Sequence, residues 1–464
     1  MWSSTLASPF HASYALTPSL TSFASAVPRT LSPSVLKAWY LSSSTDPMHP
    51  ALWFCTATSL IVWILGEVTD LPSQFNPVSI AGTPVKASGP TCPIFTVNLK
   101  FRGCSGQGNV SQVDRLWTFL PVIYSAHFTL WPYFTGAAGG VISDRMLLVL
   151  ILQLVWSARL TTNTYRRGFF NPKSEDYRWE VVRAKIPNWA FKILNLTFIA
   201  FMQNWLLLAA ELPQYLLLTL HLSGNKTPAL GLVDYALSAV FVAILAIEML
   251  ADNEQQRYQA LKARAKGKDV SQRTQKEAAA IERGFVTGGL WSYSRHPNFA
   301  CEQATWYVLY AFTILPFVSA SSYSSILASS NLTELKNYGS KLASHIPYFK
   351  DHLLSHVEKL RVTNVLDEAR RRYKTVYGLE GIYWNYAIWS PLLMSLLFFN
   401  STLLTEAISA EKYPLYKQYQ RRVSMFWPPL TTLKGLGLIA LGKKSKVEKD
   451  VFGIGSSGGK VKKL

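Results

Sequence analysis

Charged residues are scarce in this chain of 464 residues: 16% are Asp, Glu, Lys or Arg, whereas 49% are hydrophobic. The charges also lie between long apolar stretches, whereas a soluble protein of this size would spread them more evenly. This distribution excludes an ordinary soluble globular domain. It predicts an all-α fold, a polytopic membrane helical bundle.

Several short signatures of chemistry are also missing. The four cysteines, Cys55, Cys92, Cys104 and Cys301, form no CxxC or Cys/His pattern, so the sequence predicts no metal site. The GxGxxG and Walker loops, the serine nucleophile elbow and the HExxH motif are absent as well. If a nucleotide binds, a fold other than the Rossmann fold must hold it.

Acidic residues are absent from residues 1–45, which are rich in Ser, Thr, Ala and Leu. Because this stretch cannot bury much apolar surface, it predicts a disordered N-terminal tail. A transit peptide is the alternative, although such peptides carry more arginine than Arg29 alone provides.

The net charge is nevertheless strongly positive, at +19. In a membrane protein such an excess indicates positive-inside loops and contact with anionic lipid. The basic runs have no zinc-finger, homeodomain or RNA-recognition pattern, so no nucleic acid is expected. The expected partners are the lipid bilayer and a lipid-soluble small-molecule substrate.

Apolar length predicts about seven membrane spans. Pro213 interrupts the fourth and longest one, which predicts a kink or a re-entrant piece there. Residues 46–430 would form the membrane domain, and a basic C-terminal tail would follow over residues 431–464. The predicted spans are 50–67, 116–134, 141–161, 189–220, 230–250, 297–318 and 381–404.

Lys and Arg are divided unevenly between the loops. Loop 251–296 carries nine of them and the tail from residue 405 carries twelve, whereas the two short loops on the opposite side carry only Lys226. The positive-inside rule then places the C-terminus in the cytosol and the N-terminus in the lumen, with the endoplasmic reticulum as the expected membrane.

The segment 319–380 is a polar insertion between the last two predicted spans, on the lumenal side. Its sequon at Asn331 should accept a glycan, whereas the sequon at Asn109 lies on the cytosolic side and should not.

The most informative segment is GLWSYSRHPNFACE, residues 289–302. Its proline suits the first turn of a helix, which places Asn298 and Glu302 on one face at i and i+4. Polar side chains at the mouth of an apolar run are costly unless they bind something. Arg295 and His296 are expected at the surface, where they would meet a phosphate. The segment predicts a site for an anionic, partly apolar ligand at the membrane edge.

Two further polar clusters lie at the ends of predicted spans. Arg159 and Arg167 suit a phosphate clamp, and equally a snorkelling arginine beside a solvated loop. Glu248 and Asp252 are spaced i, i+4. They suit a ligand site or the polar face of a helix leaving the membrane.

Aromatic and acidic residues offer two more candidates. Tyr413 and Tyr416 follow the last predicted span, where they would cover a nucleotide or form an interfacial aromatic belt. Glu211 lies deep in the fourth predicted span. There it would act as a proton donor or bond a neighbouring helix.

Taken together, these segments resemble the steroid 5-alpha-reductase-like membrane superfamily, and most closely its uncharacterised branch of predicted reductases. Residues 289–302 are similar to that branch's GLWxYSRHPNYxGE pattern, with Phe299 in place of Tyr and Cys301 in place of Gly. Further similar blocks follow in the same order, and the resemblance covers about residues 114–430 apart from the insertion. These blocks are Trp156–Trp179, Glu248–Gln259 and Trp389–Pro428.

The resemblance implies NADPH as cofactor and reduction of a carbon–carbon double bond conjugated to a carbonyl in a lipid. Asn298 and Glu302 would hold the nicotinamide end. The other implied cofactor contacts are Arg159, Arg167, Glu248, Asp252, Tyr293, Arg295, His296, Tyr413 and Tyr416. Candidates for protonating the substrate are Glu211, Glu67 and Tyr124.

Two other functions remain open. Isoprenylcysteine carboxyl methyltransferases carry a similar RHPxY…E segment, which would imply S-adenosylmethionine as cofactor. Two arginine clusters suit a phosphate-rich dinucleotide better than S-adenosylmethionine, which has no phosphate. A non-catalytic lipid or sterol binder is the third reading, because the motif positions at Phe299 and Cys301 are substituted.

Overall fold

The structure is a computed structural model that describes residues 38, 40, 46–68, 109–171, 174–223, 229–266, 275–316 and 385–452. Of these residues 81% are helical, and no strand occurs among them. The expected all-α membrane bundle is therefore confirmed. The predicted insertion 319–380 lies outside the described residues, as do Cys92, Cys104 and almost all of the N-terminal tail.

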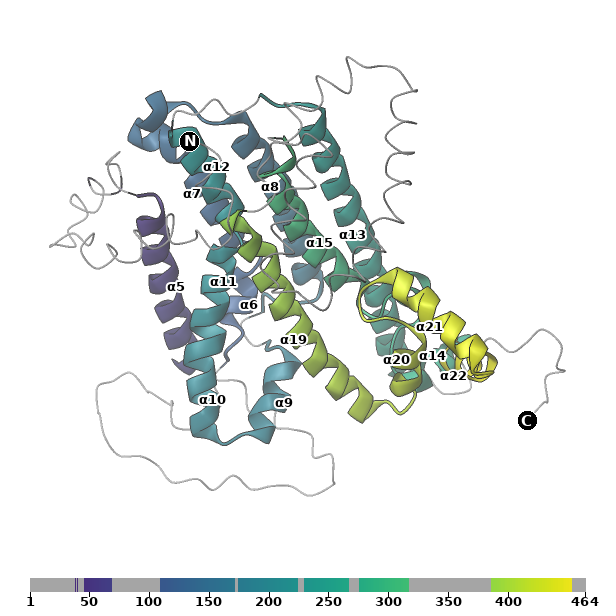
Figure 1. The fold of residues 1–464 in the computed structure, drawn as a ribbon. Coiled ribbons are helices and arrows are strands. Elements are labelled where there is room, and N and C mark those ends of the chain that lie inside the picture. The colour runs from purple at the N-terminus through teal and green to yellow at the C-terminus, as the bar shows by residue number, and fades with distance from the viewer. Residues whose placement is uncertain are drawn as a thin grey trace, which may run out of the picture.

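The described chain is a succession of α-helices joined by short 3-10 and π turns (Figure 1). The elements are α5 Met48–Val68, α6 Gln112–Leu116, α7 Leu120–Thr135, η3 Ala137–Gly140, α8 Asp144–Arg166, α9 Tyr177–Lys185, α10 Asn188–Leu194, η4 Asn195–Met202, α11 Gln203–Ala209, α12 Leu212–Leu222, α13 Leu232–Lys266, α14 Gln275–Arg283, η6 Gly289–Ser292, α15 Pro297–Ala311, η8 Tyr386–Ile388, α19 Trp389–Lys412, α20 Tyr416–Arg422, α21 Pro428–Ala440 and α22 Lys444–Phe452.

Five stretches of helix in the described residues are long and apolar enough to cross a membrane, which makes the chain a multi-pass membrane protein. They are Met48–Glu67, Asp144–Arg166, Asn188–Ala209, Leu232–Arg264 and Tyr386–Lys412. In the fourth stretch only 22% of the apolar window is buried inside the protein, so its apolar side chains face outward, as lipid contact requires.

Two of the predicted spans correspond to shorter helices. The predicted span 116–134 corresponds to α7, which has 16 residues, and the predicted span 297–318 corresponds to α15, which has 15 residues. Both pack against neighbouring helices of the bundle, and α15 bears the buried polar side chains Glu302 and Thr305.

The fourth predicted span is divided in two. The helix from Asn188 ends at Ala209, and α12 begins at Leu212 with a proline in its first turn. Since proline has no N–H to donate and fits the start of a helix, the break falls just before Pro213. The break leaves Glu211 in the interior, 1% exposed, where the sequence predicted a kink or re-entrant piece.

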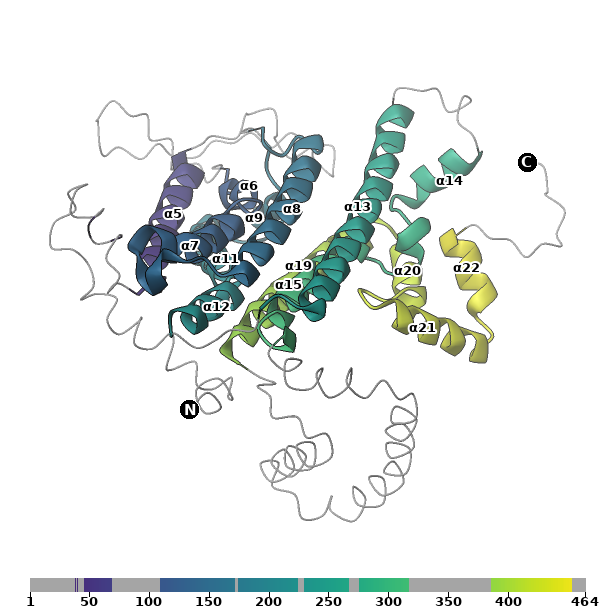
Figure 2. The ribbon, with the colours of Figure 1, turned by 90° about the horizontal axis from the view of Figure 1, so that it is seen from above.

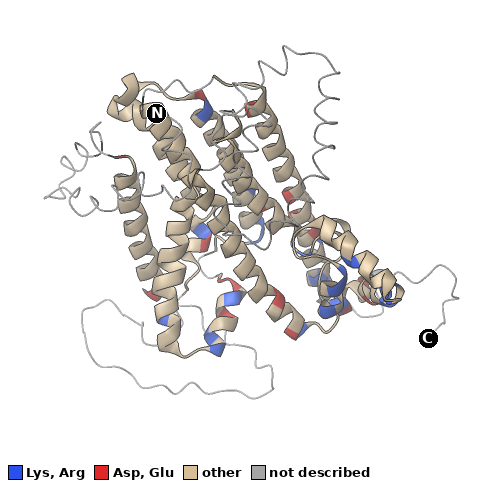
Figure 3. Cartoon of the chain, in the orientation of Figure 1, with Lys and Arg blue, Asp and Glu red and all other residues tan. Residues whose placement is uncertain are grey.

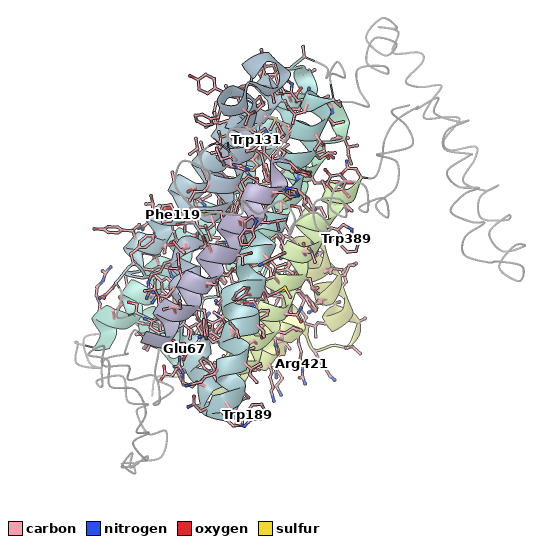
Figure 4. All side chains as sticks on the ribbon, turned by 90° about the vertical axis from the view of Figure 1, so that its left-hand side faces the viewer. Glu67, Phe119, Trp131, Trp189, Trp389 and Arg421 are labelled. Atoms are coloured by element: carbon pink, nitrogen blue, oxygen red, sulfur yellow. The ribbon has the colours of Figure 1, made fainter. Side chains whose placement is uncertain are left out.

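The helices fall into two adjoining groups (Figures 1 and 2). Helices α13, α15 and α19 run side by side, and α8 joins them to the group of α5, α7, α11 and α12. Large aromatic side chains fill the interior between them, among them Trp131, Trp156 and Trp306. One end of the bundle carries Glu67 and Trp189, and the other carries Trp131 (Figure 4).

Residues 431–452 are more ordered than a basic tail. Helices α21 and α22 pack against α20 around a small apolar core that includes Tyr419, Val423 and Leu438. Together α20, α21 and α22 form a C-terminal module beside the end of α13 (Figure 2). The expected tail thus contains two helices that the sequence analysis did not anticipate.

Candidate functional site

The site is organised by the first turns of α15. This helix begins at Pro297, so Asn298 and Glu302 share one face, as the sequence predicted. The Asn298 amide donates to Asp252 Oδ1 at 3.2 Å, and the Trp156 indole N–H donates to Glu302 Oε2 at 3.0 Å. The two residues therefore join α15 to α13 and to α8.

Arg159 lies at the centre of the cluster. Its guanidinium is 3.0 Å from Glu248 Oε1, 2.9 Å from Asp252 Oδ2 and 3.5 Å from Glu302 Oε2. All four side chains are almost completely buried. Arg159 is thus held by three carboxyl groups, and its guanidinium faces these partners rather than an open phosphate site.

The cluster has a surplus of acid. Three carboxyls surround one guanidinium, so full ionisation would leave two negative charges uncompensated. Glu248 Oε2 and Glu302 Oε1 are buried and accept no hydrogen bond of ordinary geometry from the described residues, although the two carboxyls contact each other and Glu302 contacts the Trp306 indole. Buried acceptors without donors are costly, and a ligand that presents N–H groups or positive charge would satisfy them.

Polar residues on α8 extend the cluster in both directions. Toward the basic end, Asn163 donates to Asp252 Oδ2 at 2.9 Å. Deeper in the bundle, Gln153 donates to Glu211 Oε1 at 2.7 Å. Gln153 precedes Trp156 by three residues, which separates them by about 4.5 Å along the helix axis. Glu211 and the Glu302 cluster are therefore consecutive levels of one polar stripe.

The expected surface position of Arg295 and His296 is wrong. Both are buried, 5% and 7% exposed, because Glu406 of α19 takes them as partners. Arg295 Nε and Nη2 bond Glu406 Oε1 and Oε2 at 2.6 and 2.9 Å, and His296 Nε2 lies 3.0 Å from Oε1. Burial lowers the pKa of His296, although the hydrogen bond to Glu406 acts in the opposite direction.

This second cluster fixes the C-terminal module to the start of α15. The backbone N–H groups of Arg295 and His296 donate to the carbonyls of Ser424 at 2.9 Å and Met425 at 3.1 Å. Gln420 adds a hydrogen bond to Glu406 Oε2 at 2.9 Å. The predicted phosphate ligands Arg295 and His296 therefore connect structural elements, three and two residues before Asn298.

The predicted tyrosines occupy three different settings. Tyr293 is largely exposed, whereas Tyr416 is buried against Phe285, with ring centroids 5.0 Å apart. The Tyr413 ring lies directly on Gly284, which leaves no space for a side chain there, and Lys262 Nζ lies 3.4 Å from its hydroxyl. Tyr413 and Tyr416 thus pack the module against the loop before η6.

Two of the candidate proton donors lie away from the α15 cluster. Glu67, at the end of α5, accepts from the Asn195 amide at 2.9 Å and lies 4.0 Å from Lys192. Tyr124 is buried beside α5, where its ring meets Phe54 at 5.8 Å between centroids. Among the three candidates, Glu211 alone is linked to the stripe on α8.

Exposed arginines lie at the outer end of the polar stripe on α8. Arg166 and Arg167 are exposed at the end of α8, and Arg166 Nη1 donates to Asn253 at 2.8 Å. Charged residues gather at this end of the molecule and are few along the bundle (Figure 3). A phosphate-bearing ligand would find its cations here rather than at Arg159.

Sequence reasoning missed Glu406 and Gln153. Glu406 lies just past the predicted span 381–404 and looks like part of a polar helix end. Gln153 is a lone amide inside an apolar run, which is a usable signal because an amide in that position requires a partner.

The fold and the site define a multi-pass helical membrane protein with a buried polar cluster that extends along α8 toward the basic end of the bundle. A family model described as "Protein of unknown function (DUF1295)" matches residues 103–337. The "Uncharacterized protein C594.04c" of Schizosaccharomyces pombe is 32% identical over 323 residues, which are 69% of this chain and 73% of the yeast protein. No solved structure matches the chain significantly. The chain therefore belongs to the DUF1295 family, which includes steroid 5-alpha-reductase-like proteins.

Proposed function

We propose that the protein is an NADPH-dependent membrane oxidoreductase of the predicted-reductase branch, which reduces a carbon–carbon double bond in a steroid-like, sterol-like or other enone lipid. The observation that carries the proposal is the polar stripe on α8, on which Trp156 bonds Glu302 of the acid cluster and Gln153, three residues earlier, bonds the buried acid Glu211. Such a reduction requires a positioned proton donor close to the site of hydride transfer.

The residues present fit the nicotinamide end of the cofactor. Glu248 Oε2 and Glu302 Oε1 are buried acceptors without donors, and the carboxamide of a nicotinamide supplies N–H groups. The exposed Arg166 and Arg167 suit the phosphates, since guanidinium groups bind phosphate bidentately. When bound, NADPH would supply the hydride that adds to the β-carbon of the enone.

The chain's own residues would handle orientation and the proton. Asn298 and Trp156 hold the carboxylates of Asp252 and Glu302 in place. Glu211 is buried without a cation within the described residues, so its neutral acid form is favoured and can deliver the proton that completes the reduction. The apolar surroundings of this acid exclude water from the reacting carbons.

A methyltransferase is the second candidate, and the acid surplus around Arg159 favours it specifically. The sulfonium of S-adenosylmethionine is a cation, and three carboxyls around one guanidinium would stabilise it. The same surplus disfavours phosphates at Arg159, which restricts a dinucleotide's phosphates to the outer arginines.

Cofactor binding by the detergent-purified protein separates the candidates. We expect NADPH to bind more tightly than NADH and S-adenosylmethionine, and the Asn298→Ala/Glu302→Ala variant to lose this binding. Gln303→Ala is the matched control, because Gln303 lies on the same helix and its side-chain amide donates to the backbone carbonyl of Phe299 in that helix. Binding of S-adenosylmethionine alone would replace the reductase with a methyltransferase, and binding of neither would favour a non-catalytic lipid binder.

We also propose that the protein resides in the endoplasmic reticulum with the α20–α22 module in the cytosol. The unequal distribution of Lys and Arg supports this orientation. In addition, Asn109 is buried and its amide donates to Ser174 O at 2.8 Å, which leaves no room for a glycan. Endoglycosidase treatment should shift the gel mobility of the wild type and of the Asn109→Gln variant, but not that of Asn331→Gln. A glycan on Asn109 would reverse the topology.

A further inference from the structure

Helix α21 turns its apolar side chains outward. Its buried positions, Thr431, Gly435 and Leu438, form a narrow stripe against α20 and α22. Apart from Thr432, the remaining circumference is apolar over more than three turns. The exposed large side chains are Trp427, Leu430, Leu433, Leu436, Ile439 and Leu441, from 49% to 69% exposed.

The outward face of α21 carries no charge. The one charged residue between Pro428 and Ala440 is Lys434, and its ammonium donates to the carbonyls of Gln420 at 2.8 Å and Val423 at 3.2 Å. The charge therefore points toward α20. A largely apolar, uncharged surface of this kind is unstable in water and marks a contact with a membrane or another apolar surface.

Hydrogen bonds fix the depth of α21 relative to the bundle. The Trp291 indole donates to the carbonyl of Ala251 on α13 at 3.1 Å, and Thr431 donates to the carbonyl of Tyr293 at 2.6 Å. On α13 the exposed large apolar side chains end at Leu250, and residues 252–257 are all polar or charged. Helix α21 thus begins at the level where the lipid-facing surface of α13 ends.

Exposed basic residues lie on or beside the two helices that pack against α21. Lys417 and Arg421 on α20 are exposed, as are Lys443, Lys446 and Lys449 around α22. Arg421 lies at the same end of the bundle as Trp189 and Glu67 (Figure 4). This combination of an apolar helix face and nearby cations is complementary to a leaflet that contains anionic lipid.

We infer that α21 is an in-plane membrane helix whose outer face inserts among the acyl chains of an anionic leaflet, while the basic residues of α20 and α22 contact the lipid headgroups. The docked module also holds the segment that precedes α15, because Ser424 and Met425 accept the backbone N–H groups of Arg295 and His296. This inference concerns the module's surface and does not depend on the reaction.

Spin labels in lipid nanodiscs test the insertion. In the full chain with its four cysteines replaced by alanine, single cysteines are introduced at Leu433 and Leu436, with Arg421 as the control site on the neighbouring helix. We expect labels at 433 and 436 to collide several-fold more often with lipid-soluble oxygen than with a water-soluble nickel chelate, and the label at 421 to show the reverse. Equal access of the chelate to all three labels would overturn the proposal. Exclusion of both reagents would overturn it in favour of a second protein copy.

A second measurement leaves the native cysteines in place. The fluorescence of the wild type and of Trp427→Phe is compared in nanodiscs with brominated acyl chains, so that the difference isolates Trp427. We expect quenching of this difference signal, stronger when the brominated lipid has a phosphatidylserine headgroup than when it has a phosphatidylcholine headgroup. Absence of quenching would overturn the insertion, and equal quenching by both lipids would overturn the role of anionic headgroups.

Discussion

Arg295 and Glu406 form a buried two-point ion pair, with Nε–Oε1 and Nη2–Oε2 distances of 2.6 and 2.9 Å, although 111 residues separate them in sequence. Both side chains are nearly inaccessible, 6% and 5% exposed. The pair joins the start of α15 to α19. The sequence motif predicted Arg295 as a phosphate ligand, whereas in the structure this side chain links two helices.

Removing the carboxylate of Glu406 should therefore make the protein easier to unfold. In Glu406→Gln the buried guanidinium of Arg295 loses its counter-charge, and we expect a destabilisation of about 3–5 kcal/mol. Chemical denaturation of the protein in detergent, followed by tryptophan fluorescence, measures it. The exposed pair Lys185–Glu411 is the matched control. Water screens that pair, so Glu411→Gln should have little effect. Equal stabilities of the two variants would contradict the structural role of Glu406.

Substitution of Glu211 should separate binding from catalysis. In Glu211→Gln the amide keeps the contact with Gln153 but has no acidic proton, so cofactor binding should persist while turnover falls by about 10²–10⁴-fold. Steady-state kinetics on an enone lipid, with cofactor titration alongside, give both quantities. Glu67→Gln should leave both unchanged, because Glu67 bonds Asn195 instead. Wild-type turnover in Glu211→Gln would remove this residue from the mechanism.

Acidification should weaken the cluster around His296. Its folded-state pKa is lowered from the ordinary value of 6.5, so below that pH the unfolded chain binds the proton more readily. The stabilisation from neutral His296 is therefore complete above about pH 6.5 and is lost as the pH falls through this value toward the folded pKa. Thermal midpoints at about pH 8 and about pH 5.5 measure the loss. In His296→Gln the drop should be smaller, and an unchanged drop would assign the pH dependence to other groups.

Two nearby glycines should respond differently to the same substitution. At Gly284, with φ +87°, an added Cβ would lie 2.1 Å from the Tyr413 ring, whereas at Gly288 it would meet nothing within 4 Å. Gly284→Ala should destabilise the protein by about 1–3 kcal/mol through backbone strain and the displaced ring. Gly288→Ala should be nearly neutral, since its φ of −89° suits any residue. Unfolding midpoints in denaturant compare the two, and similar values would mean that Tyr413 does not pack against Gly284 in solution.

Sequence patterns anticipated the parts of the site that lie close together along the chain. Pro297 fixes the start of α15, which alone sets Asn298 and Glu302 on one face. The i, i+4 spacing of Glu248 and Asp252 likewise aligned two carboxyls, and both contact Arg159. Local helix geometry determines such relationships, so they can be predicted without knowledge of the fold.

The ion-pair partners of side chains in distant segments could be identified only from the tertiary structure. Arg159 and Arg295 have the same charge and are both buried, yet one binds three carboxyls of the site and the other binds Glu406. The identity of a buried arginine's counter-ion depends on which helices pack together, and composition carries no such information.

The sequence by itself thus determined a membrane protein of packed helices, the break before Pro213 and the polar face of α15, because apolar length and helical periodicity are local properties. The tertiary structure alone decided that Glu211 joins the site through Gln153, that His296 is buried against Glu406 and that α21 turns an apolar face outward. These outcomes depend on which surfaces of separate helices meet, and that is settled only when the whole bundle has packed.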